Sequence, residues 1–156
     1  WGSTPTCRGF QHFAGFYSAA SDYWTHMVGA GYDYHDDFAI DPRIKNVHTT
    51  LAITSAVQKW VTAQIAASAG AKTFAYVAHE AVHGPLEVPA RYVNEECLAL
   101  VPAVNPTRQI YCGMVRAADE SVKNVTETYE KLGILDDTLI ILSTDNGGTP
   151  AEGGNK

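Results

Sequence analysis

The chain has 156 residues, of which 46% are hydrophobic and 18% are charged, and its formal net charge is −6. This length is sufficient for one ordinary domain with a hydrophobic core, and the composition is typical of a globular protein. The acidic charge argues against nucleic acid as a partner, because its binders usually carry a basic stripe. The sequence has no apolar run near the roughly 20 residues that a membrane-spanning helix needs, so no transmembrane segment is expected.

The two ends of the chain carry loop-like sequence. Residues 1–46 are rich in aromatic residues, glycine and aspartate without a sustained period, which predicts long loops with short elements. The chain has no initiator methionine, and residues 152–156 read Glu-Gly-Gly-Asn-Lys. Both ends are therefore expected to be cuts within a longer polypeptide, with residues 1–156 forming part of a single domain.

Two helices and two strands are predicted in alternation. Apolar residues recur at helical spacing over residues 49–67 and again over 113–132, and Gly70 and Gly133 are placed to end the helices. The apolar runs 72–78 and 138–143 follow the helices and predict strands, the first buried on both faces, while residues 79–108 form a proline-bearing connection. This order predicts an α/β fold with a mostly parallel sheet flanked by helices, incomplete in this chain.

A polar turn follows the second predicted strand, where open α/β sheets commonly bind ligands. The turn reads Asp145-Asn146-Gly147-Gly148. Its adjacent carboxylate and amide oxygens suit a hard cation such as calcium or magnesium. An ordinary turn is the alternative, since Asp, Asn and Gly are also the residues that turns prefer.

A second polar cluster follows the first predicted strand. Residues 79–83 read His-Glu-Ala-Val-His, a literal match to a zinc-protease motif that requires a helix. Here the segment follows a strand, and Gly84-Pro85 comes directly after it, which disfavours helical backbone before the proline. A single histidine, His83, directed at an anionic ligand is therefore the preferred interpretation.

Several segments resemble, in family order, the type I sulfatases of the arylsulfatase B kind. They are residues 4–10 with 22–24, 82–89, 111–126 and 142–148. The resemblance implies an alkaline-phosphatase-like fold and a calcium-dependent sulfuric ester hydrolase with a formylglycine nucleophile. Carried over by position, Asp145 and Asn146 would bind the Ca²⁺, and His83 would be catalytic, contacting the sulfate or the leaving oxygen.

The chain departs from the family pattern at the nucleophile. None of Cys7, Cys97 and Cys112 stands in the formylglycine signature Cys-x-Pro-x-Arg, and the early calcium-binding aspartates are also missing. The chain is therefore expected to be one part of a sulfatase catalytic domain, inactive by itself. The alternatives are a non-catalytic sulfatase-like structural or binding protein within a larger assembly, and a related metal-dependent phosphodiesterase.

The remaining candidates are weaker. Cys97 and Cys112 flank a loop rich in Pro and Asn and are candidates for a disulfide, which would indicate an oxidising compartment, with free thiols as the alternative. Asn124 stands in a glycosylation sequon inside a predicted helix, and His26 is a candidate for lining the substrate pocket. His12 is expected at the surface, and the aspartates among residues 33–41 are expected to be a solvated acidic loop rather than a cation cluster.

The resemblance also implies partners and a location. The expected substrate is a sulfate ester, with a sulfated polysaccharide as one candidate, and the chain is expected to meet the rest of its own polypeptide or a larger assembly. A secreted or lysosome-like location is expected.

Overall fold

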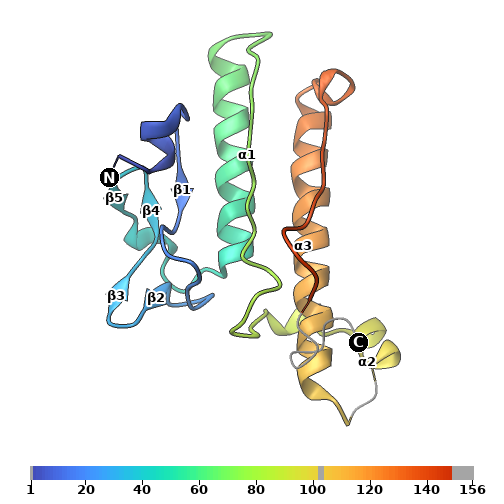
Figure 1. Cartoon of the computed structure of the whole chain (residues 1–156). Coiled ribbons are helices and arrows are strands. Elements are labelled where there is room, and N and C mark those ends of the chain that lie inside the picture. Colours follow the sequence, from blue (N-terminus) through green and yellow to red (C-terminus); the bar gives the residue numbers. More distant parts are fainter. Residues whose placement is uncertain (1, 102–103, 149–156) are drawn as a thin grey trace.

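The computed structural model describes residues 2–101 and 104–148, so Trp1 and the terminal stretch 152–156 lie outside it. Its α-helices are α1 (Thr49–Ala67), α2 (Glu95–Leu100) and α3 (Pro106–Lys131). Short 3-10 helices lie at Pro5–Arg8, Pro42–Ile44, Ala90–Tyr92 and Leu135–Asp137. The strands are β1 (Ala14–Gly15), β2 (Met27–Val28), β3 (Gly31–Tyr32), β4 (His35–Asp36) and β5 (Ala39–Ile40), and Figure 1 shows them together on one side of α1. Within the described ranges, no helix has the length and apolar character needed to cross a membrane.

The strands form small antiparallel sheets. One sheet has the order β1-β4-β5, and β2 and β3 form a separate hairpin. Ala14 pairs with Asp36, and His35 pairs with Ile40, both in antiparallel register. The mostly parallel sheet predicted from the sequence is therefore not found among the described residues.

Helix α1 occupies the residues that its apolar spacing predicts. Its side chains Ala52, Ile53 and Val61 are buried. Thr54 and Gln58 form hydrogen bonds to α3, so the helix packs against α3 through the side that carries them. Gly70 has a φ of +80°, so the chain leaves the helix through the left-handed conformation that glycine adopts without a Cβ clash.

Helix α3 begins earlier than the predicted 113. Asn105 caps it by accepting a hydrogen bond from the Arg108 amide at 3.0 Å, and Pro106 stands in the first turn, where no amide hydrogen is needed. Gly113 lies inside the helix. A Cβ at this position would come within 2.9 Å of the Val93 side chain, so a larger residue would not fit there. The glycine thus permits close packing and does not mark a helix start.

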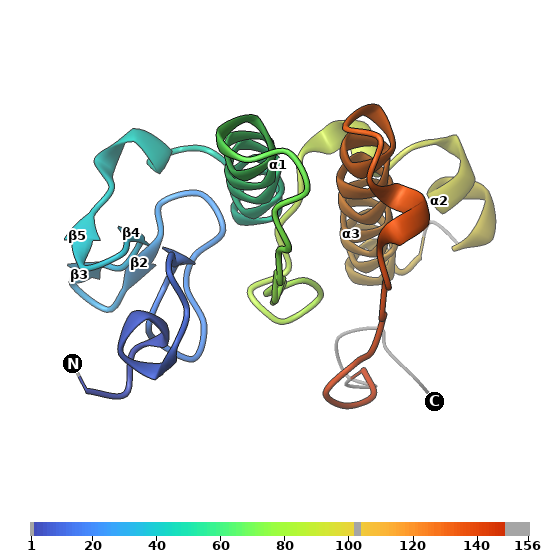
Figure 2. The ribbon, with the colours of Figure 1, turned by 90° about the horizontal axis from the view of Figure 1, so that it is seen from above.

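The two predicted strands, 72–78 and 138–143, are not part of any sheet in the described residues. Each returns along the preceding helix, and both run in the same direction (Figure 1). Seen from above, α1 and α3 lie in one layer and the two segments leave it on the same side (Figure 2). Leu139 and Leu142 are 84% and 80% exposed, and Phe74 and Tyr76 are exposed too, so the predicted burial is wrong. The reason is physical: in the part of the chain that the structure describes, no neighbouring strand pairs with the backbone of these segments.

A disulfide joins α2 to α3. Cys97 and Cys112 are bonded at a sequence separation of 15, which is the pairing that the sequence allowed. Cys97 is fully buried, whereas Cys7 is an exposed free thiol. The bridge fixes α2 against α3.

Replacing Cys97 and Cys112 together by serine is expected to lower the free energy of unfolding by about 3 kcal/mol, because a closed loop of this size no longer restricts the unfolded chain. Chemical denaturation of the intact protein measures the change. Cys7→Ser is the matched control and should leave the midpoint unchanged, since that thiol is exposed and unbonded. Equal midpoints for the double variant and this control would contradict the prediction.

Candidate functional site

Segment 79–87, which follows the extended run after α1, is held in place by the distant residues 21–23. The buried Tyr23 donates its hydroxyl to the carbonyl of His83 at 2.9 Å. The amide of Ser21 donates to Glu80 Oε1 at 2.7 Å. These bonds fix both the start and the middle of the segment, and so they fix the backbone of His83.

The end of the same segment is fixed at Glu87. Its carboxylate accepts a hydrogen bond from the amide of Tyr23 at 3.2 Å, and its carbonyl accepts one from His48 Nε2 at 3.1 Å. Asp22 holds the donor loop by accepting the amide of Thr25 at 2.6 Å, which lowers the pKa of the Asp22 carboxyl. Residues 21–23 are therefore the support for the His83 segment.

The His83 side chain is exposed, while its backbone is anchored. Nδ1 lies 2.6 Å from the carbonyl oxygen of Gly84, and a carbonyl only accepts, so Nδ1 carries the hydrogen. Nε2 is then the nitrogen that remains for a ligand. It accepts a proton or a hydrogen bond when the ring is neutral and donates when the ring is protonated.

Residues 79–83 do not form the zinc site of a His-Glu-x-x-His helix. None of them is helical, and Glu80 is turned inward onto Ser21. Burial raises the pKa of the Glu80 carboxyl, and the Ser21 amide opposes that rise. His79 is bound to α3, whereas His83 is exposed, so the two imidazoles have separate roles.

His79 ends a buried chain of hydrogen bonds that ties the segment to both long helices. Thr54 on α1 donates its hydroxyl to the Thr50 carbonyl, so Ser121 on α3 must donate to Thr54 across 2.6 Å. His79 Nε2 then donates to Ser121 Oγ at 2.9 Å. Burial lowers the pKa of His79, which agrees with a neutral ring. Sequence reasoning missed this contact, because a serine and a threonine on two helices carry no local signal.

Ser121→Ala is expected to cost about 1–3 kcal/mol of folding stability, since Thr54 Oγ1 and His79 Nε2 would stay buried without this partner. Thermal or urea unfolding of the intact protein measures the loss. Thr62→Ala is the control, because the exposed Thr62 hydroxyl donates to the Gln58 carbonyl of its own helix. A loss no larger than that of the control would show that the buried chain does not stabilise the fold.

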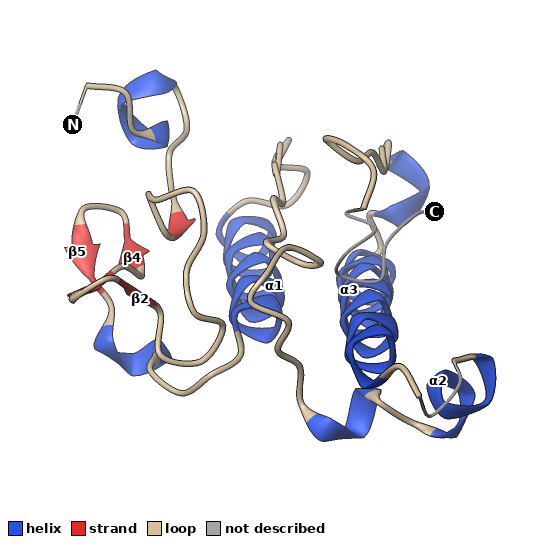
Figure 3. Ribbon diagram, turned by 60° about the horizontal axis from the view of Figure 1, so that its bottom comes forward, coloured by secondary structure: helices blue, strands red, loops and turns tan. Residues whose placement is uncertain are grey.

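The Asp145-Asn146 turn is exposed at the end of the second extended segment. Asp145 Oδ1 accepts the amide of Asn146 at 2.7 Å, and Asn146 Nδ2 donates to the Gly147 carbonyl at 3.1 Å. The amide oxygen of Asn146 and the second carboxylate oxygen of Asp145 are left for a cation, which fits two oxygen ligands of Ca²⁺. Figure 3 shows this turn and the loop of segment 79–87 projecting from the same side of the helices.

The two other residues predicted from the sequence, His26 and Asn124, are buried and half-buried. His26 is fully buried, and its Nε2 lies 3.1 Å and 3.0 Å from the carbonyls of Ile44 and Val47. Its described contacts are those of a residue that holds loops together, and none of them supports a place in a substrate pocket. Asn124 is half-buried on α3, and its carbonyl accepts a hydrogen bond from Gln58 of α1, so its glycosylation stays a prediction.

The chain belongs to the sulfatase family: the family model described as Sulfatase matches residues 2–156, which confirms the resemblance seen in the sequence. Arylsulfatase J of Mus musculus is a curated relative with 34% identity over 157 residues, covering 97% of this chain. The chain spans only 25% of that relative's length.

Two solved structures share the fold. Ps i-CgsB in complex with k-i-k-neocarrahexaose superposes with a TM-score of 0.83, and Ps i-CgsB alone superposes with 0.81. Each is 24% identical, and each match covers 99% of this chain and 36% of the other. At this identity the likeness establishes the fold, an alkaline-phosphatase-like arrangement of helices and small sheets.

Proposed function

We propose that the intact protein is a sulfuric ester hydrolase and that this chain supplies part of its calcium and sulfate site. Membership of the sulfatase family supports the reaction class. The observation that carries the site is His83, whose exposed imidazole stands on a backbone that Tyr23 anchors. The Asp145-Asn146 turn lies on the same side of the helices.

His83 acts at the sulfate or at the leaving oxygen. With Nδ1 engaged by the Gly84 carbonyl, Nε2 is the atom that gives a proton to the leaving oxygen or stabilises its developing negative charge. Asp145 and Asn146 supply oxygen ligands to the Ca²⁺. When bound, the cation supplies positive charge that attracts the sulfate oxygens. Since Ca²⁺ takes about 6–8 oxygens, its other ligands come from elsewhere in the intact protein.

Segments 72–78 and 138–143 become strands of a mostly parallel sheet in the intact domain. Three features support this proposal: the two segments run in the same direction, they are apolar, and their side chains are exposed here. Pairing with further strands would satisfy the backbone, and elements packed on the faces of the sheet would bury residues such as Leu139 and Ile141, which are exposed here. The sheet would then place the two site loops beyond the carboxyl ends of its strands.

The proposed substrate is the sulfate ester of a saccharide. The support is indirect: one solved structure of the same fold is a complex with k-i-k-neocarrahexaose. A secreted or lysosome-like location is proposed on the strength of the Cys97–Cys112 disulfide, which persists in oxidising compartments.

Peptide mapping of the intact protein tests the proposal. A formylglycine within a Cys-x-Pro-x-Arg or Ser-x-Pro-x-Arg segment outside residues 1–156 is the expected result. Absence of both signatures would overturn the enzyme proposal in favour of a non-catalytic sulfatase-like binding or structural protein.

A further inference from the structure

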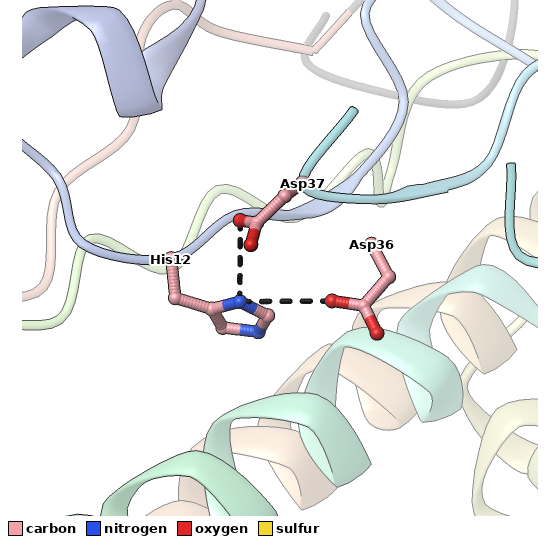
Figure 4. Close-up of side chains that lie close together, drawn as sticks. All are labelled: His12, Asp36 and Asp37. Atoms are coloured by element: carbon pink, nitrogen blue, oxygen red, sulfur yellow. Dashed lines mark ion pairs between the residues drawn. The ribbon is translucent and has the colours of Figure 1, made fainter. Parts of the chain in front are cut away.

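His12, Asp36 and Asp37 bring three ligating atoms together away from the proposed sulfate site. His12 Nδ1 lies 3.6 Å from Asp36 Oδ1 and 3.3 Å from Asp37 Oδ1, and all three ligating atoms lie within 4.8 Å of one another. Figure 4 shows the imidazole nitrogen directed at both carboxylates. We propose that these side chains form a binding site for a zinc-like divalent transition metal ion.

The two distances from His12 Nδ1 fit a shared metal ion better than a simple salt bridge. A tetrahedral Zn²⁺ with bonds of about 2.0–2.1 Å separates neighbouring ligand atoms by roughly 3.3–3.4 Å. The two distances from His12 Nδ1, 3.3 Å and 3.6 Å, lie close to that separation between ligand atoms. They are longer than the roughly 2.7–2.9 Å of a good charge-assisted hydrogen bond.

The backbone holds the site in place without the metal. Antiparallel pairing of β1 with β4 sets Ala14 opposite Asp36, which brings the residues just before β1 to the end of β4. Asp37 and Phe13 exchange two hydrogen bonds of 2.8 Å each, one between their backbones and one from the Phe13 amide to Asp37 Oδ1. The ligands therefore come from two short segments in a fixed register.

The carboxylates have the outer partners that metal ligands usually have. Arg43 donates to Asp36 Oδ2 at 3.2 Å, which orients this carboxylate and leaves Oδ1 for a metal. The same guanidinium is held by Asp41 at 2.7 Å, so its charge is shared between two carboxylates. Asp37 Oδ1 retains a lone pair beside the Phe13 hydrogen bond. A net charge of −6 on the chain favours a cation overall.

The donor set selects the class of ion. One imidazole nitrogen with two carboxylates suits Zn²⁺ and its first-row neighbours, whereas Ca²⁺ takes oxygen ligands almost entirely. The site is therefore independent of the Ca²⁺ proposed at Asp145 and Asn146. Its role is structural: the ion would fasten the segment before β1 to the β4–β5 hairpin.

Zinc titration of the chelator-treated intact protein by calorimetry tests the site, with Ca²⁺ in a parallel titration. The wild type should bind one more zinc ion than His12→Ala, and Asp36→Asn and Asp37→Asn should bind this ion tenfold or more weakly. Zinc should raise the melting temperature of the wild type but not that of His12→Ala. The exposed Asp136→Asn is the control and should behave as wild type.

The zinc site and the proposed calcium site can be tested separately. Asp145→Asn should keep the His12 zinc site even where it loses calcium, so either site can fail while the other stands. Equal zinc stoichiometry and affinity in the wild type, His12→Ala and Asp36→Asn would overturn the proposal. Because Asp36→Asn keeps the shape of the side chain, this comparison holds even if the alanine variant does not fold.

Discussion

Replacing His83 by alanine in the intact protein is expected to lower kcat for a sulfate ester by about 10²–10⁴-fold, the usual contribution of one positioned acid or base. The loss should fall mainly on kcat, because Nε2 acts on charge that develops in the transition state. Steady-state kinetics with an aryl sulfate, read as separate kcat and KM values, measures it.

The His83 side chain is exposed, so its removal should leave the fold intact. The melting temperature of His83→Ala should match that of the wild type, which separates a chemical role from a structural one. Ser121→Ala gives the opposite pattern, with lower stability and a smaller effect on kcat, since Ser121 contacts His79 and not His83. A His83→Ala enzyme with wild-type kcat would remove this residue from the mechanism.

Asp145→Asn is expected to weaken Ca²⁺ binding by at least about 10–100-fold, since even outer partners of metal ligands have effects of that size. The substitution removes one negative charge from the site but keeps the shape of the turn. Activity should fall at limiting calcium and recover, at least in part, when calcium is in excess. Activity measured across a calcium titration in a metal-buffered assay gives the shift directly.

The exposed Asp136→Asn is the matched control for Asp145→Asn. It changes the same chemical group on the preceding connection, between α3 and the extended segment, and should leave the calcium dependence unchanged. An identical calcium dependence for the two variants would show that Asp145 is not a ligand.

The helices were predictable because their signal is local. Helix α1 spans Thr49–Ala67, as the spacing of its apolar residues predicts. The start of α3 was missed, because the proline-rich run before it reads as a loop although Asn105 and Pro106 form a good helix cap. A capping residue followed by proline was the signal available for it.

The sheet could not be read in the same way, because strand pairing depends on residues far apart in the chain. Residues 72–78 and 138–143 have strand-like sequences, but nothing in the described structure pairs with them. The observed ladders are two residues long and lie in the aromatic N-terminal region, where no period marks them.

The sequence predicts the candidate site residues but not the residues that hold them in place. His83 and the Asp145-Asn146 turn follow from family resemblance, whereas the support that Ser21 and Tyr23 give to segment 79–87 acts across about 60 residues. The only hint was that both segments match the family. The sequence predicts only surface residues at His12, Asp36 and Asp37, since the antiparallel pairing of β1 with β4 is what brings them together.

The most direct test of the account is hydrolysis of a chromogenic aryl sulfate by the intact protein, assayed with calcium and after chelation. The account predicts turnover that chelation abolishes, that added calcium restores, and that His83→Ala reduces by about 10²–10⁴-fold. A folded intact protein that shows no turnover with calcium present would contradict it and would favour the non-catalytic sulfatase-like protein.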